Sequence, residues 1–181
     1  MRYYIENRRK KEITKFTREL VLYTVMRYSE RISVQKYLDT FGISIYSMKR
    51  YIKDLDIAYS LNYNGEFYFQ DEYSTYGYGY KKHPHIPYRN PEMNEMRKNR
   101  LRRVCEMFED FYGYFRDFFK SGDETVYVYL SDIDDPDEEV DRYPLTARDF
   151  YSAGASPKEK RQVQRDFLEL MNAAEIAKRL L

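Results

Sequence analysis

Three basic side chains at helical spacing give the strongest indication of chemistry in this sequence. Lys49, Arg50 and Lys53 fall in a segment, 45–57, whose apolar residues recur at the period of an α-helix. With those apolar residues facing inward, the step of about 100° per residue turns the basic side chains outward. Such a face suits the phosphates and base edges of a nucleic-acid groove, whereas a solvated helix face is the plainer interpretation.

The same segment carries hydroxyl groups beside its cations. We expect Tyr46, Lys49 and Arg50 to lie nearest to base edges, with Ser47 and Lys53 on phosphate. The full set of expected DNA contacts is Ser44, Tyr46, Ser47, Lys49, Arg50, Lys53 and Asn64. A basic cluster adds candidate phosphate contacts, although it fits a solvated segment equally well: Arg8, Arg9, Lys10 and Lys11.

Two other groups of residues are similar to metal sites but lack the required spacing. The acidic run 132–141 departs from a calcium-binding EF-hand loop at three positions. Pro136 stands at the fifth ligand position, Asp137 replaces the glycine at the sixth, and Tyr143 replaces the glutamate at the twelfth. The His-Pro-His run at 83–85 would need metal ligands from elsewhere in the chain. We therefore expect no metal, no cofactor and no enzymatic activity.

Composition and charge limit the class of protein. The 181 residues carry a formal net charge of +1, but residues 1–103 hold 21 Lys and Arg against 12 Asp and Glu, and residues 104–181 hold 10 against 18. The basic half suits contact with nucleic acid, or alternatively attracts the acidic half of the same chain. No segment is apolar for long enough to span a membrane, and Cys105 has no partner for a disulfide. We expect a cytoplasmic protein.

The first third of the sequence predicts three helices. Hydroxyl side chains able to cap helix N-termini mark their starts, namely Thr14 or Thr17, Ser33 and Ser44. The first helix is expected to end near Tyr28 and to be buried on much of its surface, and the others to cover 34–41 and 45 to about 57. Gly42 can end the second helix in a left-handed conformation, so only three residues separate it from the third. This pattern is typical of a helix-turn-helix.

A hairpin signal follows these helices. Asn64 and Gly65 can supply the two positive φ angles of a type I′ turn, and apolar residues alternate on both sides of them. A two-stranded ribbon is only marginally stable alone, so we expect it to pack against the helices. Helix, turn, helix and ribbon in that order predict a winged helix.

The stretch ISVQKYLDTFGISIYSMKRYIKDL, residues 32–55, resembles the winged helix-turn-helix of DeoR-type bacterial transcription regulators and of the domains that precede WYL modules. The matching positions are Ile32, Ser33, Val34, Leu38, Phe41, Gly42, Ile43, Ser44, Met48, Arg50, Ile52 and Leu55. The chain departs from the family at Tyr46, Ser47 and Tyr51, where Arg, Thr and Asp are usual. The resemblance implies a DNA-binding regulator, with one basic residue fewer for guanine readout.

The second half predicts two helices whose apolar residues repeat every three or four positions. One is expected from Pro91 to Lys120, and the other follows a capping box formed by Ser156 and Glu159. Their apolar seams can pair with each other or with a second chain. We expect a homodimer formed through Leu101, Val104, Phe108, Phe111, Phe115, Phe118, Phe167 and Leu170.

Two further features of this half call for partners. The basic residues of the helix at 91–120 precede its acidic ones, the reverse of the order that the helix dipole favours, so groups outside the helix must compensate. The alternating segment 125–131 predicts one strand, which pairs either with the wing of the same chain or with its own copy in a dimer.

The predicted fold class is mainly α with a small β component. Residues 1–72 are expected to form a winged helix-turn-helix domain, 73–91 a Tyr-, Gly- and Pro-rich linker, and 92–181 a helical oligomerisation region with one extra strand. The expected function is a sequence-specific regulator of transcription that binds double-stranded DNA as a homodimer. The alternatives are a protein-interaction adaptor that uses the winged helix as a scaffold, and a replication or partition protein that binds DNA.

Overall fold

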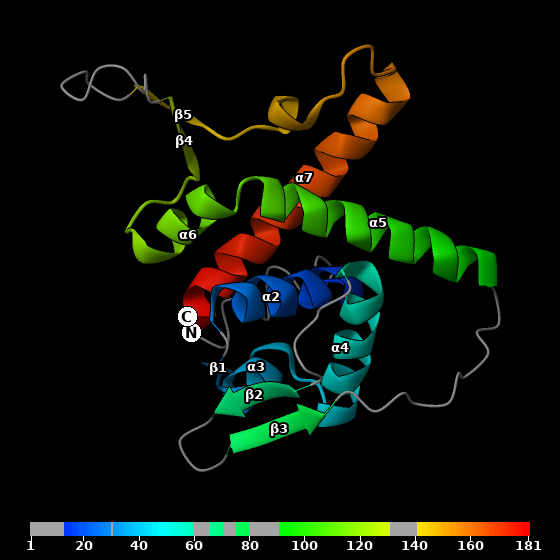
Figure 1. The fold of residues 1–181 in the computed structure, drawn as a ribbon, viewed down its shortest axis with the longest axis vertical. Helices are drawn as coiled ribbons and strands as arrows, with labels where there is room; N and C mark the ends of the chain where they lie inside the picture. The colour runs from blue at the N-terminus through cyan, green and yellow to red at the C-terminus, as the bar shows by residue number, and fades with distance from the viewer. Residues whose placement is uncertain (1–12, 30, 60–65, 71–74, 80–90, 131–140) are drawn as a thin grey trace.

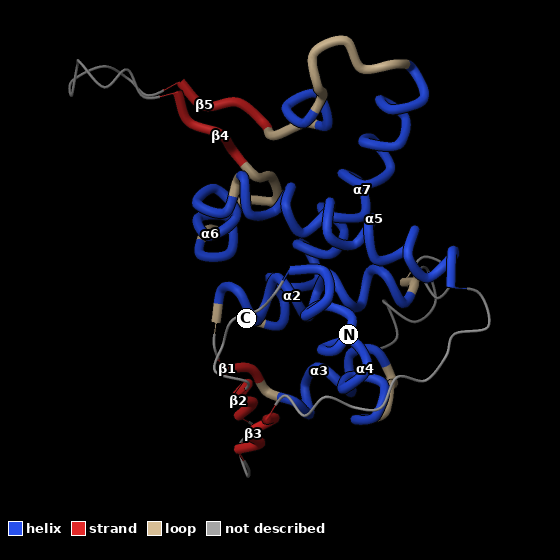
Figure 2. Tube along the Cα trace, turned by 45° about the vertical axis from the view of Figure 1, so that its right-hand side comes forward, coloured by secondary structure: helices blue, strands red, loops and turns tan. Residues whose placement is uncertain are grey.

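The computed structural model describes residues 13–29, 31–59, 66–70, 75–79, 91–130 and 141–181. The fold is mainly helical, as predicted, and two small sheets accompany the helices. Figures 1 and 2 both show helix α2 in the middle, with α3, α4 and one sheet on one side and α5, α6 and α7 on the other. None of the described helices is both long enough and apolar enough to cross a membrane.

Helix α2 (Lys15–Tyr28) is the centre of the core. Its N-terminus is capped by Thr14, whose Oγ1 accepts a hydrogen bond of 3.2 Å from the backbone N–H of Thr17. Apolar side chains are buried around most of the helix: Phe16, Leu20, Val21, Leu22, Tyr23 and Val25. Helices α4, α5 and α7 all pack against it. The structure confirms the predicted extent of this helix and its burial on most of its surface.

One side of α2 is occupied by α3 (Val34–Phe41), α4 (Ile45–Tyr59) and a three-stranded sheet. The buried Tyr37 fixes α3 against α2 by donating a 2.8 Å hydrogen bond to the carbonyl oxygen of Arg18. In the sheet, β2 (Glu66–Gln70) lies between β1 (Arg31–Ile32), which is parallel to it, and β3 (Thr75–Gly79), which is antiparallel.

The pairing of β2 corrects the predicted hairpin. Asn64 and Gly65 lie outside the described residues, and the antiparallel partner of β2 is β3, which follows it in the chain. Strand β3 also falls within the segment 73–91 that was predicted to be a linker. The tyrosines that alternate with glycine in β3 have high strand propensity. Strand β3 pairs with the edge of β2 that does not pair with β1.

The predicted helix from Pro91 to Lys120 is interrupted. Helix α5 (Pro91–Asp110) ends before Phe111, whose φ of −120° and ψ of 22° are not helical, and α6 (Tyr112–Lys120) starts again in a new direction. Gly113 lowers helix propensity at this point. The break lets Phe111 pack on Phe150, with ring centroids 4.9 Å apart, and the predicted continuous seam does not extend through it.

The predicted extra strand has a partner that was not foreseen. Strand β4 (Tyr127–Leu130) pairs antiparallel with β5 (Asp141–Pro144), which is neither the wing nor a second chain. This two-stranded ribbon projects from α6 in both views. The short helix η1 (Ala147–Phe150) follows and leads to α7 (Pro157–Leu180).

Helix α7 begins as predicted. Ser156 Oγ accepts from the N–H of Glu159, and the Glu159 carboxylate accepts from the N–H of Ser156, which completes the capping box. The helix then packs mainly along α2, so residues of the predicted regions 1–72 and 92–181 form a single hydrophobic core. The two predicted regions are therefore packed together, while the domain division itself stays a prediction.

Candidate nucleic-acid interface

The connection between α3 and α4 has the tight geometry that its sequence predicts. Ser33 caps α3 by accepting a 3.2 Å hydrogen bond from the N–H of Lys36. The helix ends at Gly42, which adopts the left-handed conformation (φ 61°, ψ 39°) and donates its N–H to the carbonyl oxygen of Leu38. Ser44 then caps α4, because its Oγ accepts a 3.3 Å hydrogen bond from the N–H of Ser47. Gly42, Ile43 and Ser44 alone join the two helices.

The inner face of α4 contains the three residues expected there. Met48, Ile52 and Leu55 are buried against the core. Tyr51 is buried on the same side, and its hydroxyl oxygen accepts a 3.0 Å hydrogen bond from Nε of Arg18 on α2. Tyr51 thus helps to attach α4 to α2, and its ring does not belong to the exposed face of α4.

The outer face of α4 carries the basic and hydroxyl side chains expected to contact DNA. Tyr46 is 72% exposed, and Lys49 and Arg50 are also exposed. The ammonium nitrogen of Lys49 lies 5.8 Å from the centroid of the Tyr46 ring. Lys53 is partly exposed one turn further along the helix. Tyr46, Lys49 and Arg50 stay exposed although α5 packs against α4.

This outer face offers the donors that a phosphate backbone or a base edge accepts. The Lys49 ammonium can contact phosphate as a point charge, and the Arg50 guanidinium can also bind the O6 and N7 atoms of guanine. Hydroxyl groups lie beside the start of the helix at Ser44, which is exposed, and at Ser47, which is partly exposed. Of the other expected contacts, Asn64 and the cluster Arg8, Arg9, Lys10 and Lys11 lie outside the described residues.

The basic residues of α5 are compensated from outside the helix, as its charge order predicts. Both oxygens of Asp166, which lies on α7, have an arginine partner. Arg100 Nε lies 2.8 Å from Oδ1, and Arg103 Nη2 lies 3.0 Å from Oδ2. Arg97 forms ion pairs with Glu19 on α2 and Asp54 on α4. These three arginines hold the core together, so the proposed nucleic-acid interface does not include them.

Glu19 and Asp54 form a buried carboxyl pair behind the outer face of α4. Burial raises the pKa of Glu19 to about 8, and its hydrogen bond with Asp54 acts in the same direction. Burial also acts to raise the pKa of Asp54, but hydrogen bonds from Glu19 and Lys15 and the charges of Lys15 and Arg97 outweigh it, so this pKa is lowered. Burial and Asp54 therefore favour the protonated form of Glu19, whereas Arg97 acts against them.

This buried group was not among the features expected from the sequence. A signal was nevertheless present, because Glu19 directly precedes the apolar run 20–23 of a helix expected to be largely buried, and Asp54 stands between Tyr51 and Leu55 on the inner face of α4. A charged residue at a core position of a helix requires a buried partner. The identity of that partner, Arg97, depends on the tertiary arrangement of three helices.

The residues expected to form a dimer are used within this chain. Leu101, Val104 and Phe108 of α5, Phe115 and Phe118 of α6, and Leu170 of α7 are buried in the core, whereas Phe111 and Phe167 are partly buried against it. The rings of Phe108 and Phe115 lie 4.9 Å apart. A second chain is not needed to cover this seam.

The described residues contain no cluster of three or more His, Cys, Asp and Glu side chains that is arranged to hold a metal ion. The histidines at 83 and 85 and most of the acidic run 132–141 lie outside that part of the chain. Cys105 is buried among apolar side chains of the core, and burial raises the pKa of its thiol well above the usual range. Its thiol therefore stays protonated and unreactive at neutral pH.

Comparison with known proteins gives no relative to support or oppose these assignments. No family model, no curated protein and no solved structure matches the chain.

Proposed function

We propose that the chain binds duplex DNA through a winged helix-turn-helix formed by residues 15–79. In this proposal α4 is the recognition helix and enters the major groove, and β2 and β3 form the wing. The observation that carries the proposal is the division of α4 into two faces. Tyr46, Lys49 and Arg50 are exposed on one face, and Met48 and Leu55 are buried on the other.

The connections between the elements support this assignment. A three-residue link with a left-handed Gly42 holds α3 and α4 at a fixed angle, which is what a helix-turn-helix requires. Two antiparallel strands follow α4, and β1, from the segment before α3, completes their sheet. This order of helix, strand, two helices and two strands is that of winged-helix proteins.

The residue roles follow from chemistry and position. Arg50 and Lys49 are assigned to base edges and neighbouring phosphates, and Tyr46 to phosphate or to the methyl group of thymine. Ser47 and Lys53 are assigned to the backbone on either side. Phosphate contacts fix the register of the protein on the duplex, and base contacts select the sequence.

Regulation of transcription by a homodimer is the fuller form of the proposal. A two-fold dimer would recognise two half-sites about one helical turn apart. The buried residues of α5, α6 and α7 serve the core of one chain, so the dimer contact belongs to other surfaces.

The test is the salt dependence of binding to duplex DNA by the full chain. We expect the logarithm of the affinity to fall linearly with the logarithm of the salt concentration, because each phosphate contact releases condensed counterions. Selection from a random duplex pool should then give one preferred sequence. Absence of binding at low salt would overturn the proposal and favour the adaptor, whereas binding without sequence preference would overturn the regulator and leave a general DNA-binding role.

A further inference from the structure

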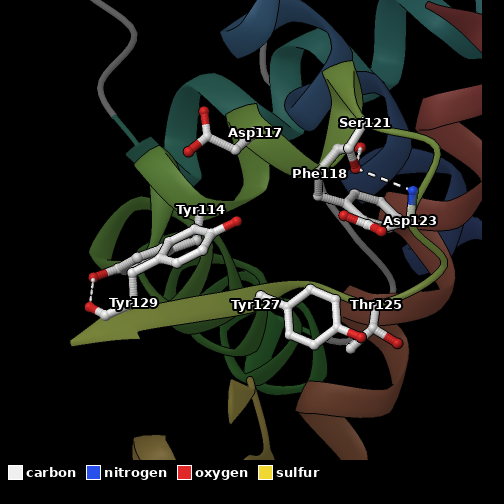
Figure 3. A pocket seen from close by; sticks show the side chains of 8 residues that line it. All are labelled: Tyr114, Asp117, Phe118, Ser121, Asp123, Thr125, Tyr127 and Tyr129. Carbon is white, nitrogen blue, oxygen red and sulfur yellow. Dashed lines mark hydrogen bonds between the residues drawn. The ribbon is translucent and has the colours of Figure 1, made fainter. Parts of the chain in front are cut away.

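A small cleft lies between α6 and β4, on the side of α2 opposite to α3 and the three-stranded sheet. Its volume is about 130 Å³, which is enough for the head group of a ligand and too little for an extended molecule. Figure 3 shows side chains from α6, from β4 and from the loop between them around this space. The lining consists of Tyr114, Asp117, Phe118, Ser121, Asp123, Thr125, Tyr127 and Tyr129.

Aromatic rings make up half of this lining. The rings of Tyr114 and Tyr129 lie together with centroids 6.0 Å apart, and the Tyr114 hydroxyl donates to the carbonyl oxygen of Tyr129. Phe118 and Tyr127 stand away from that pair, on the other side of the space (Figure 3). The faces of such rings carry partial negative charge and attract cations.

The polar groups of the cleft are also negative. Asp117 and Asp123 contribute carboxylates, and the cleft lies at the C-terminal end of α6, where the helix dipole is negative. Within the described part of the chain the Asp123 carboxylate has no ion-pair partner. Asp117 has only a loose one, Arg116 Nε at 3.7 Å, with both side chains about half exposed.

The chain already places its own cations on two of these rings. The Lys178 ammonium lies 4.1 Å from the centroid of Phe118 and donates to the backbone carbonyl of Asp123. The guanidinium carbon of Arg142 lies 4.5 Å from the centroid of Tyr127. Neither cation belongs to the lining of the cleft. Phe118 and Tyr127 thus each already face a cation of the chain, and these cations limit the excess negative charge around the cleft.

We propose that this cleft binds an alkylated ammonium group, such as the head group of choline. The combination of four aromatic rings and two carboxylates provides cation–π attraction and charge complementarity in one small space. Alkylation reduces the hydration of an ammonium ion, so such a group enters an aromatic cleft at lower desolvation cost than sodium or an unsubstituted ammonium ion. The proposal uses no residue of α4 and is independent of DNA binding.

The experiment compares choline with its neutral isostere, 3,3-dimethylbutan-1-ol, by NMR titration of the full chain at constant ionic strength. We expect millimolar choline to shift the ring resonances of Tyr114, Tyr127 and Tyr129 in a saturable manner. The isostere has the same shape without the charge, so its affinity should be lower than that of choline by a factor of about five or more. Equal binding of the two would overturn the proposal and identify a plain apolar cleft. Sodium chloride at the same concentration should leave these resonances unchanged.

Two variants locate the site. Asp123→Asn removes a carboxylate of the lining that has no side-chain partner among the described residues, so the fold should persist while choline affinity falls about threefold or more. Asp110→Asn removes an exposed carboxylate of α5 outside the cleft and should leave choline affinity unchanged. Equal loss in both variants would mean that choline responds to overall charge, which would also overturn the proposal.

The source of the ammonium group is tested in the same way. Phosphatidylcholine vesicles present the group at a membrane surface, and free choline presents it in solution. The small cleft favours the free cation, so we expect choline to bind and the vesicles to leave the protein in the supernatant after centrifugation. Sedimentation of the chain with the vesicles would overturn the free-cation part of the proposal, and the Asp123→Asn variant would then report whether the cleft is the site.

Discussion

Glu19 of α2 and Asp54 of α4 are both buried and share the same two cations. Arg97 of α5 forms ion pairs with both, and the Lys15 ammonium lies 2.9 Å from Asp54 Oδ2 and 3.4 Å from Glu19 Oε1. Three helices therefore meet in one polar group. Because Asp54 lies in the same helix as Lys49 and Arg50, this group sets the orientation in which α4 presents its outer face.

The protonation of Glu19 makes stability depend on pH. Its pKa is about 8 in the folded chain against an ordinary 4.5, so between these values the unfolded chain loses a proton that the folded chain keeps. The free energy of unfolding should therefore fall as the pH rises from about 5 to 8, and level off above that. Glu19→Gln cannot ionise and should make the dependence flatter over this range. Urea denaturation of both proteins at several pH values measures the difference.

Asp54 provides the opposite control in the same group. Its pKa is lowered, so its contribution to stability is present at neutral pH and is lost as the pH falls below about 4. The Glu19→Gln variant should still lose stability as the pH falls below about 4, although Asp54 keeps fewer partners in that variant. If wild type and Glu19→Gln showed the same slope between pH 5 and 8, Glu19 would be ionised in the folded chain and the assignment of its proton would be wrong.

Removal of the two cations on the outer face of α4 should weaken DNA binding. Lys49→Ala combined with Arg50→Ala is expected to cost about 1 to 3 kcal/mol of binding free energy for each side chain that no longer reaches the DNA, and to reduce the slope of the salt dependence. Lys158→Ala with Arg161→Ala removes the same charge from the exposed start of α7 and is the matched control. Fluorescence anisotropy with a labelled duplex compares the two variants. Equal affinity in both would refute the role assigned to α4.

Two glycines should respond in opposite ways to the same substitution. A Cβ atom added at Gly42 or at Gly113 meets no atom within 4 Å, so only the backbone conformation decides the effect. Gly42 has φ of 61°, and Gly42→Ala should destabilise the chain by about 1 kcal/mol. Gly113 lies in the first turn of α6, and Gly113→Ala should stabilise it by about 0.5 kcal/mol. Thermal unfolding would contradict this account if both variants shifted in the same direction.

The ion pairs between α5 and α7 should contribute strongly to stability. Asp166 is buried and accepts hydrogen bonds from Arg100, Arg103 and Gln162. Asp166→Asn leaves two arginines without their anion and is expected to cost about 3 kcal/mol, reduced to the extent that both arginines can reach water. Chemical denaturation measures the loss.

An exposed carboxylate gives the comparison for this variant. Asp117 lies 3.7 Å from its neighbour Arg116, and both side chains are about half exposed. Asp117→Asn should change the free energy of unfolding by less than about 0.5 kcal/mol. A similar loss in Asp117→Asn and Asp166→Asn would mean that net charge, and not the buried pairing, governs stability.

The aromatic seam should behave as the core of one chain. Phe108 is fully buried and contacts the rings of Tyr23 and Phe115. Phe108→Ala should lower the free energy of unfolding by about 3 to 5 kcal/mol. Because the seam is covered within one chain, the unfolding midpoint of the wild type should not change with protein concentration. A midpoint that rises strongly with concentration, and a Phe108→Ala variant that is folded but monomeric, would restore the predicted dimer interface.

Local signals in the sequence predicted the elements whose determinants lie close together in the chain. The caps at Thr14, Ser33 and Ser44, the left-handed Gly42 and the capping box at Ser156 all depend on residues within a few positions of each other. The inner and outer faces of α4 followed from periodicity alone. Periodicity also identified the apolar residues of the second half, most of which are buried in the core, although the continuous seam is broken at Phe111.

Features that depend on distant residues were not predictable in this way. The Asn64-Gly65 signal suggested a hairpin, but the pairing of β2 with β3 depends on competition among several strands. The break at Phe111 accompanies a ring contact with Phe150, which lies 39 residues away in the sequence. Heptad spacing describes an apolar stripe without stating what covers it, so burial against α2 and pairing with a second chain gave the same pattern.

The packing of α2 against α7 has a consequence for the synthesis of the protein. Thr17 of α2 donates a 2.7 Å hydrogen bond to Glu169 of α7, and the two residues are separated by 152 positions. On the ribosome α2 is made before the other described helices, and α7, its main packing partner, is made after them. Helices α4 and α5 can cover part of α2 earlier, but the face of α2 that packs on α7 stays uncovered until α7 has been made. A premature stop codon anywhere before α7 would leave a nascent product that cannot close its core.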